Sequence, residues 1–250
     1  MVEEASYLLL ELSLTRARWK EVAGNGRAFL NAWPESRRIH DARWLTAKAL
    51  RNNDQVAEAY RIYEAIWYDT PGSRWAVDAH DRLKRIEGDG HVRSRTRPAN
   101  DRYKFIKVLR KVGLHKEALD EITEVRSRFP LHEQTNGILF MKAMSLHDLR
   151  RNEDCVSTVD ELRRQFPRSQ WVPAAAIYAV KALRRFNSTS RVRYWSNWVV
   201  DNYPRHDKAF EALYDLGVYL GNVVSEEEGL KVLERLIETG RERPIVVDAL

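Results

Sequence analysis

The sequence predicts an all-α fold, built as a solenoid of repeated helical hairpins. Aromatic-Pro or Thr-Pro junctions recur along the chain, and three of the four intervals between their prolines are 37 residues. Apolar residues keep fixed distances from these prolines, and no segment alternates polar and apolar residues as a strand would. Internal periods of about 20 to 50 residues are typical of solenoids. The junction prolines are Pro34, Pro71, Pro130, Pro167 and Pro204.

Four positions in each repeat hold small or apolar residues when the repeats are aligned on their prolines. Twelve residues before the proline lie Val22, Ala59, Ala118, Cys155 and Val192. Five residues before it lie Phe29, Ile66, Val125, Leu162 and Val199. Eight residues after it lie Ala42, Ala79, Ile138, Ala175 and Ala212. Sixteen residues after it lie Leu50, Glu87, Leu146, Leu183 and Leu220, with Glu87 as the exception. Steps of three and four place such residues on one side of a helix, so we expect these columns to form the core.

The prolines and the apolar pattern together predict thirteen helices. Proline cannot continue a helix and disfavours helical geometry in the residue before it, so each junction separates two helices. The expected helices cover residues 3–13, 15–32, 37–51, 54–69, 74–87, 101–112, 115–128, 132–150, 153–165, 170–185, 189–202, 206–221 and 226–238.

Residues with helix-capping chemistry lie near the ends of these segments. Serine follows a junction proline by two residues at three places, where its hydroxyl is expected to cap the next helix: Ser36, Ser73 and Ser169. Ser225 and Glu228 form a capping box. Glycines are expected to end helices at Gly88, Gly113 and Gly240. The stretch Gly24-Asn25-Gly26 falls inside the second expected helix, so this helix is expected to be kinked or split.

The one interval that differs from 37 residues, the 59 residues between Pro71 and Pro130, indicates an insertion that divides the chain. We expect an N-terminal repeat array over residues 1–87, an irregular linker over 88–100 and a C-terminal array over 101–250. The linker carries Arg93, Arg95 and Arg97, which either grip an anionic ligand or belong to a solvated segment. The last residues, Val247 to Leu250, resemble the start of a repeat's second helix, so we expect the natural protein to continue.

Composition narrows the classes of function. The net charge of +6 favours an acidic partner such as nucleic acid, an anionic cell-wall polymer or a phospholipid surface. One cysteine excludes an internal disulfide and a cysteine-rich metal site. No apolar run reaches the roughly 18 residues of a membrane helix. The N-terminus lacks a basic region and a cleavage site, so the chain is either cytoplasmic or was separated from its export signal.

The sequence contains no recognisable catalytic, metal or cofactor motif. The acidic residues of the segment 117–124 have the spacing of a solvated helix surface near an N-terminus: Glu117, Asp120, Glu121 and Glu124. Cys155 shares its column with valine and alanine, which favours a buried apolar role over that of a nucleophile. Trp75 and Trp171 share a column four residues after the proline, which favours packing under the turn.

The best candidate for ligand binding is an aromatic and basic cluster in the segment 191–198. It consists of Arg191, Arg193, Tyr194, Trp195 and Trp198. Such a cluster can stack on sugar rings or bases, although Trp195 or Trp198 must fill the core. Arg43 with Trp44 is a second, weaker candidate of the same kind.

Two stretches of the sequence resemble known protein families. The spacing of Ala59, Tyr63, Ile66 and Pro71 resembles the second helix and closing proline of tetratricopeptide repeats. The stretch AYRIYEAIWYDTPGSRWAVDAHDRL, with the later RRQFPRSQWVPAAAIYAVKAL, resembles the N-terminal superhelical region of bacterial soluble lytic murein transglycosylases. These resemblances imply a right-handed α-superhelix of tetratricopeptide-like hairpins.

The second resemblance implies a role in peptidoglycan turnover in the periplasm. That family cleaves glycan strands with a catalytic glutamate in a separate domain, and the signature around this glutamate is absent from the sequence. We therefore expect a non-catalytic scaffold that contacts peptidoglycan. The alternative is a tetratricopeptide-like adaptor that binds a protein partner, and a nucleic-acid binder is third.

Overall fold

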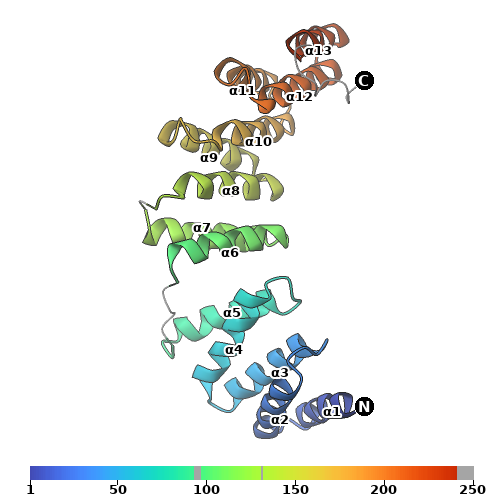
Figure 1. Cartoon of the computed structure of the whole chain (residues 1–250), viewed down its shortest axis with the longest axis vertical. Helices are drawn as coiled ribbons and strands as arrows, with labels where there is room; N and C mark the ends of the chain where they lie inside the picture. Colours follow the sequence, from blue (N-terminus) through green and yellow to red (C-terminus); the bar gives the residue numbers. More distant parts are fainter. Residues whose placement is uncertain (93–96, 131, 241–250) are drawn as a thin grey trace. The chain divides into compact units, whose positions relative to one another are not determined.

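The computed structural model of the chain describes residues 1–92, 97–130 and 132–240. All regular structure in these ranges is helical, and Figure 1 shows the order of the helices. The helices are α1 Val2–Thr15, α2 Trp19–Ala32, α3 Ile39–Asn52, α4 Val56–Asp69, α5 Ala76–Gly88, α6 Ala99–Lys111, α7 His115–Arg128, α8 Thr135–Asp148, α9 Asn152–Gln165, α10 Val172–Arg184, α11 Thr189–Asn202, α12 Asp207–Val223 and α13 Glu226–Gly240. None of these described helices is both long and apolar enough to span a membrane.

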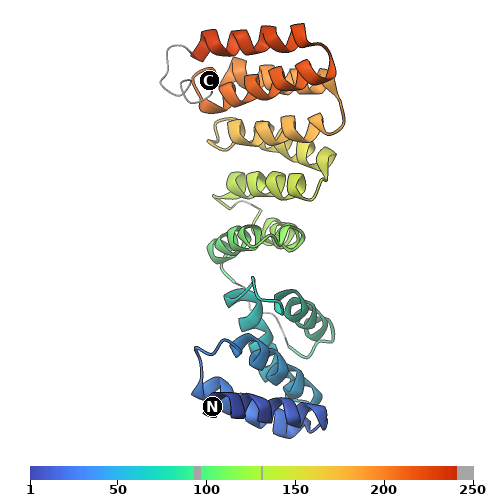
Figure 2. The same cartoon turned by 90° about the vertical axis from the view of Figure 1, so that its right-hand side faces the viewer.

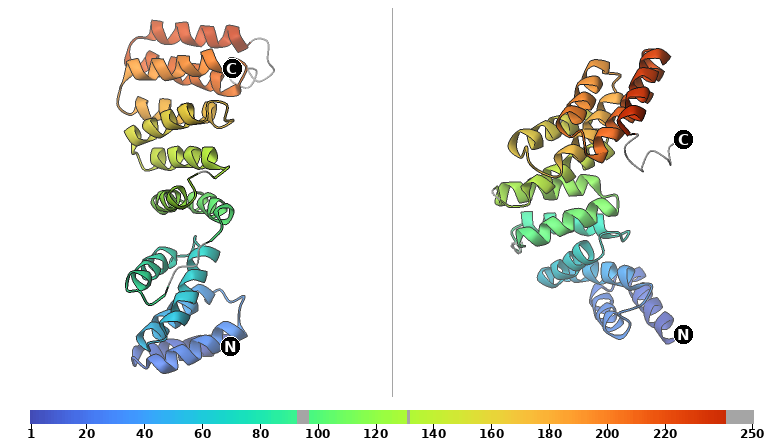
Figure 3. Two further views of the ribbon diagram at one scale, coloured as in Figure 1. Left: turned by 90° about the vertical axis from the view of Figure 1, so that its left-hand side faces the viewer. Right: turned by 45° about the horizontal axis from the view of Figure 1, so that its top comes forward.

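The chain forms two compact units, residues 1–98 and 99–250. In the first unit, α1 to α5 pack in sequence as antiparallel neighbours. In the second unit, α6 to α13 also pack in sequence, and Figures 2 and 3 show α12 and α13 lying side by side. Alternate helices of this unit also touch, because α8 contacts both α6 and α10, and α10 contacts α12. The second unit is therefore a solenoid in which alternate helices form one continuous layer.

A turn at each junction proline starts the second helix of each hairpin. In all five repeats, the residue two positions after the proline donates its backbone N–H to the carbonyl of the residue that precedes the proline. Examples are Ser36 to Trp33 and Ser169 to Phe166. The next helices begin only at Ile39 and Val172, so the expectation that these serines are N-caps is wrong. Their hydroxyls instead accept hydrogen bonds inside the turn, from the backbone N–H of Arg38 at 3.0 Å and of Trp171 at 3.2 Å. The helix that follows Ser73 likewise starts later, at Ala76.

A second turn, with one residue in the left-handed region, joins consecutive hairpins. It recurs with the same spacing as the prolines, at Ala17, Asp54, Gly113, Arg150 and Asn187. In each case the next residue's N–H donates to a carbonyl five residues back, as in Leu114 to Leu109 at 2.9 Å. This is the Schellman arrangement that ends a helix. The three glycines expected at helix ends lie there: Gly113 occupies this left-handed turn after α6, and Gly88 and Gly240 are the last residues of α5 and α13.

The expected core columns are confirmed. Every residue at the positions twelve and five before the proline and eight after it is buried, including Cys155, Leu162 and Ala175. At the position sixteen after the proline, the leucines are buried as well. The exception, Glu87, accepts a hydrogen bond from the Tyr60 hydroxyl at 2.6 Å, which compensates its partial burial.

Helix α2 is continuous through Gly24, Asn25 and Gly26, so the expected kink or break is wrong. It begins at Trp19 rather than at residue 15, because Ala17 has the positive φ of the preceding turn. A Cβ atom on Gly26 would lie 2.0 Å from Thr46 Oγ1 on α3. The glycine therefore lets α2 and α3 approach each other closely.

The insertion predicted from the 59-residue interval is explained by α6 and the segment before it. Arg102 of α6 is 2% exposed and forms ion pairs with Glu121 Oε1 at 3.2 Å and Glu124 Oε1 at 2.9 Å. Glu121 is thus buried, and the expectation that it belongs to a solvated helix surface is wrong. The ion pairs join the inserted helix to α7.

Candidate binding surfaces

The two arginines of the predicted cluster on α11 are both engaged by carboxylates. Arg191 forms a bidentate pair with Glu153 of α9, at 2.7 and 2.9 Å. This pair lowers the pKa of Glu153 and raises that of Arg191, since each charge stabilises the other. Arg193 forms an ion pair with Glu228 of α13.

The aromatic residues of the same cluster surround Arg163 of α9. Its guanidinium carbon lies 4.7 Å from the centre of the Trp195 ring and 4.8 Å from that of Trp198. Arg163 Nη1 also donates to the Tyr194 hydroxyl at 3.0 Å. Trp195 is 4% exposed and packs in the core, whereas Tyr194 is 52% exposed. Tyr194 is therefore the ring of this cluster that is most open to a ligand.

A cavity of about 330 Å³ opens beside this cluster, lined only by residues of α9 and α11. It brings together three of the predicted residues, Arg191, Tyr194 and Trp195, with Glu153 and Asp160. Arg193 and Trp198 are outside its lining. Both carboxylates are paired, Glu153 with Arg191 and Asp160 with Arg163 at 2.5 Å. The charges that line the cavity are thus largely balanced, and the group it offers to a ligand is the aromatic ring of Tyr194.

In the second predicted candidate, Arg43 with Trp44, the tryptophan is buried and packs against another tryptophan. Trp44 is 8% exposed, and its ring stacks on Trp75 with centroids 4.9 Å apart and an interplanar angle of 5°. The indole N–H of Trp75 donates to Asp41 Oδ1 at 2.6 Å. Arg43 lies beside Trp44 on α3 and is partly buried. This arrangement supports the packing role expected for Trp75.

Of the three linker arginines, only Arg97 lies within the described residues. Its guanidinium carbon is 3.5 Å from the centre of the Tyr68 ring, and it pairs with Glu64 Oε1 at 3.6 Å. Arg93 and Arg95 lie outside the described residues. Arg97 therefore contacts α4 of its own unit.

A different surface, which the sequence analysis missed, carries a cavity of about 320 Å³ between α6 and α8. Its lining is Tyr103, Lys107, Arg110, Lys111, Gly137, Phe140, Met141 and Trp171. Phe140 stacks on Trp171 with centroids 5.1 Å apart, as expected for a tryptophan packed under the turn. A Cβ atom on Gly137 would lie 2.9 Å from the Tyr103 hydroxyl. Glycine at this position therefore makes room for the tyrosine.

A neighbouring cavity of about 490 Å³ lies along α8, α10 and α12. Its lining is His147, Lys181, Arg184, Arg185, Asn187, Tyr219, Asn222 and Val223. Lys181 pairs with Glu211 at 2.7 Å and Arg184 with Asp215 at 2.6 Å. We refer to the lining residues of these two cavities together as the α6–α12 face.

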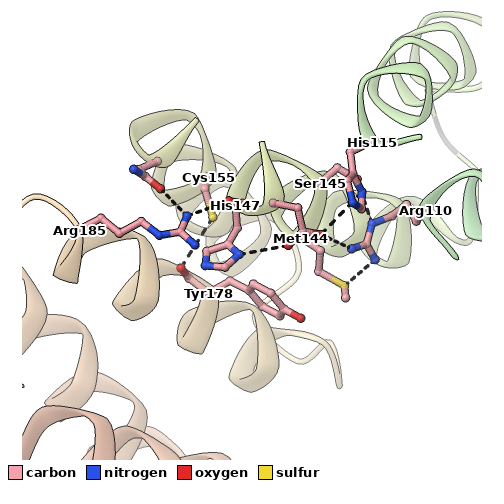
Figure 4. A network of polar contacts seen from close by, with 10 residues as sticks. Arg110, His115, Met144, Ser145, His147, Cys155, Tyr178 and Arg185 are labelled. Atoms are coloured by element: carbon pink, nitrogen blue, oxygen red, sulfur yellow. Dashed lines mark hydrogen bonds and ion pairs between the residues drawn. The ribbon is translucent and has the colours of Figure 1, made fainter. Parts of the chain in front are cut away.

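The two cavities meet at the last turn of α8, which Figure 4 shows from close by. On one side, Arg110 donates to Ser145 Oγ at 2.9 Å and to Asp148 Oδ2 at 3.0 Å. On the other side, Arg185 Nη1 donates to the His147 carbonyl at 2.8 Å and to Asn152 Oδ1 at 3.1 Å. Burial is the largest influence on His147 and lowers its pKa, and the contact with Asp148, which acts in the opposite direction, only partly offsets it. His147 is therefore mainly neutral near pH 7.

The α6–α12 face has a signal in the sequence, because its side chains recur with the repeat. Arg110, His147 and Arg184 are 37 residues apart, and Tyr103 and Phe140 are separated by the same interval. This polar column lies beside the four apolar columns and has the same period, so an alignment of polar side chains on the prolines would have revealed it.

No group of three or more metal-ligating side chains occurs in the part of the chain that the structure describes. Cys155 is buried, and this burial raises the pKa of its thiol to about 12. Its Sγ lies 3.8 Å from the Tyr178 carbonyl, to which it donates a weak hydrogen bond.

No protein-family profile and no curated protein sequence matches the chain. Solved structures of similar form include MamA, residues 41 to the end, from Desulfovibrio magneticus RS-1, with 14% identity, 75% of this chain and 97% of that chain covered, and a TM-score of 0.49. YrrB, described as a TPR protein with an unusual peptide-binding site, has 16% identity, coverages of 90% and 98%, and a TM-score of 0.47. PilF from Pseudomonas aeruginosa has 12% identity, coverages of 96% and 93%, and a TM-score of 0.44. The helical hairpins and recurring turns described above give the chain a tetratricopeptide-like helical-repeat fold.

Proposed function

We propose that the chain is a non-catalytic scaffold that binds a segment of a partner protein on its α6–α12 face. The observation that carries this proposal is the pair of adjacent cavities on alternate helices of one solenoid. Equivalent side chains recur there from helix to helix, so the face presents similar groups at regular intervals. Such an arrangement suits an extended polymer better than a compact small molecule.

The chemistry of the lining also favours binding over reaction. The cavities combine aromatic and aliphatic walls with a few cationic groups, as ligand-binding clefts commonly do. The one histidine in the lining, His147, lies near Arg185 and Lys181 and has no nucleophilic side chain as a hydrogen-bond partner in the described contacts. A nucleophile and a base within reach of each other are the usual sign of covalent catalysis.

A test of this proposal can use the single native cysteine, which is buried. Lys111→Cys would add one exposed thiol at the edge of the α6–α8 cavity, and a bulky maleimide attached there would cover the face. We expect peptides selected from a random library on the unmodified chain to lose binding to this conjugate. The matched control is Lys20→Cys with the same label, on α2 of the other unit, which should leave binding unchanged.

The proposal is wrong if the library yields no binding peptide, or if the label at residue 111 has no more effect than the label at residue 20. Binding is measured by fluorescence anisotropy with each selected peptide. The thermal unfolding of both conjugates should match that of the unlabelled chain, which verifies that the label blocks a surface rather than unfolding it.

A second candidate function is contact with peptidoglycan, as the resemblance to lytic transglycosylases implies. The observation that favours it is the open Tyr194 ring beside Arg191 in the α9–α11 cavity, since aromatic rings stack on sugars. In this reading the chain would be part of a periplasmic transglycosylase. Retention on purified peptidoglycan sacculi that is lost in Tyr194→Ala would support it, and equal retention of both chains, or none, would contradict it.

A further inference from the structure

This inference rests on the proposed function and specifies its ligand. We infer that the segment bound by the α6–α12 face is acidic and carries an apolar side chain, which enters the α6–α8 cavity while neighbouring carboxylates meet the cations around it. Three features of the face support this inference: the charge of its lining, the contacts of its aromatic rings and the fixed positions of its arginines.

The lining of the two cavities has one sign of charge. It contains Lys107, Arg110, Lys111, Lys181, Arg184 and Arg185 and no aspartate or glutamate. A surface of this kind attracts a partner of opposite charge and disfavours one of the same charge. The chain as a whole also carries a net positive charge, of +6.

Some cations of the face are paired with a carboxylate of the chain, and others are not. Arg110, Lys181 and Arg184 each pair with a carboxylate that lies outside the cavity linings. Lys107 and Lys111 are exposed, and no carboxylate within the described residues pairs with them. Arg185 donates to a carbonyl and an amide oxygen, which are neutral acceptors. Lys107, Lys111 and Arg185 therefore keep a full charge for a ligand.

Each aromatic ring at the α6–α8 cavity already has one face in contact with a neighbour in the chain. The Lys107 ammonium lies 4.4 Å from the centre of the Tyr103 ring, and Phe140 and Trp171 stack on each other with an interplanar angle of 15°. Single-stranded nucleic acid is bound by stacking its bases on open ring faces. The rings here instead serve as apolar walls beside Met141, which suits an aliphatic or aromatic side chain of a peptide.

Two of the cations are held in place before a ligand arrives. Arg110 and Arg185 are fixed from opposite sides by the last turn of α8, as Figure 4 shows. Fixed side chains lose less conformational freedom on binding, which strengthens their interaction with a carboxylate. Because both arginines contact the same turn, one peptide can reach both cavities.

The experiment compares synthetic probes on the full chain by fluorescence anisotropy. The first probe is a 12-residue peptide of glutamate and aspartate with two leucines and a phenylalanine. Three further probes replace its apolar residues by serine, its acids by lysine, or the whole peptide by a single-stranded RNA of 12 nucleotides. We expect the first peptide to bind most tightly, with an affinity that falls as NaCl is raised. We expect the serine peptide to bind about tenfold or more weakly, and the lysine peptide and the RNA not to bind.

Charge reversal tests whether the face itself is responsible. Lys107→Glu with Lys111→Glu should weaken binding of the first peptide by about tenfold or more. Arg16→Glu with Lys20→Glu changes the net charge by the same amount on exposed residues of the other unit, and should leave binding within about twofold. Circular dichroism of both double variants verifies that the helices are intact.

The inference is overturned if the acidic peptide binds no better than the lysine peptide, if the RNA binds as tightly, or if the two double variants behave alike. It is also overturned if peptides selected from the random library bind the face but are not enriched in acidic residues, an outcome that leaves the proposed function standing. Failure of every peptide to bind would remove both.

Discussion

Several reactive side chains of this protein have structural roles because of their surroundings. The thiol of Cys155 lies in a core column between α9 and α10, and Arg102 is enclosed with Glu121 between α6 and α7. In the sequence both are polar or reactive groups that could serve chemistry. In the structure each lies where solvent and ligands cannot reach it.

The burial of Cys155 leads to a prediction about its reactivity. Because the pKa of its thiol is raised to about 12, almost none of the reactive thiolate is present at pH 8. We expect the native chain to resist an aromatic disulfide reagent at pH 8, and the chain unfolded in guanidinium chloride to react fully. The absorbance of the released thiolate measures both. Rapid reaction of the native chain would contradict the burial of this residue.

The ion pairs of Arg102 lead to a second prediction. Arg102→Ala would remove the guanidinium that pairs with the buried carboxylate of Glu121, so we expect the free energy of unfolding to fall by about 3–5 kcal/mol. The matched control is Arg164→Ala, whose largely exposed pair with Asp160 should contribute no more than about 1 kcal/mol. Urea unfolding followed by circular dichroism measures both changes. Similar small losses in the two variants would mean that Arg102 is solvated.

At the scale of elements, two turns define each repeat and differ in their residue requirements. The proline turn is recognisable in the sequence because proline restricts the backbone in the same way at each junction. The left-handed turn is harder to recognise, because glycine occupies it only at Gly113 among five repeats. At the other four places the surrounding hydrogen bonds hold a side-chain-bearing residue at positive φ.

This difference predicts opposite effects of exchanging glycine at the left-handed position. Gly113→Ala should destabilise the chain by about 1–2 kcal/mol, because a Cβ atom disfavours φ near +82° although nothing lies within 4 Å of it. Arg150→Gly should stabilise the chain, by less than about 1 kcal/mol, because glycine also loses more backbone freedom on folding. Thermal unfolding measures both. A melting temperature that rises in Gly113→Ala would contradict the assigned turn.

Helix α2 supplies a matched pair of substitutions in one element. A Cβ atom on Gly24 meets nothing within 4 Å, so Gly24→Ala should stabilise the helix by about 1 kcal/mol through its higher helix propensity. A Cβ atom on Gly26 meets Thr46 of α3, so Gly26→Ala should destabilise the chain by about 1–3 kcal/mol. Equal effects in urea unfolding would show that α2 and α3 are not in close contact at Gly26.

At the scale of the whole molecule, the chain is two compact units, and each draws its core from its own helices. One cluster of buried apolar residues runs from Ile106 to Leu220 and lies wholly in the second unit. Contacts in a solenoid are mainly between neighbouring helices, so a unit with its own core can fold without the other.

We therefore expect residues 99–250 to fold when produced alone. Their helical content per residue should match that of the full chain, and they should unfold in a cooperative transition, as circular dichroism with temperature would show. A flat, non-cooperative melt would mean that the second unit depends on the first. The same fragment contains the complete lining of the α6–α12 face, so it also provides material for the peptide measurements.

The all-helical solenoid and its core could be predicted from the sequence. Helices, proline turns and apolar columns depend on residues close together in the chain, and their repetition every 37 residues makes each instance verify the others. The residues Val125, Leu162 and Val199, which share one column, are accordingly all buried.

Only the tertiary structure determined which charged groups are neutralised and which are open. Arg191 looked free in the sequence but pairs with Glu153, 38 residues away, whereas Lys107 and Lys111 line a cavity without a carboxylate. The physical reason is that an ion pair depends on distances of a few ångströms between side chains of different helices. The period of the repeat predicts which helices are neighbours. It does not predict the direction of each side chain, which depends on packing.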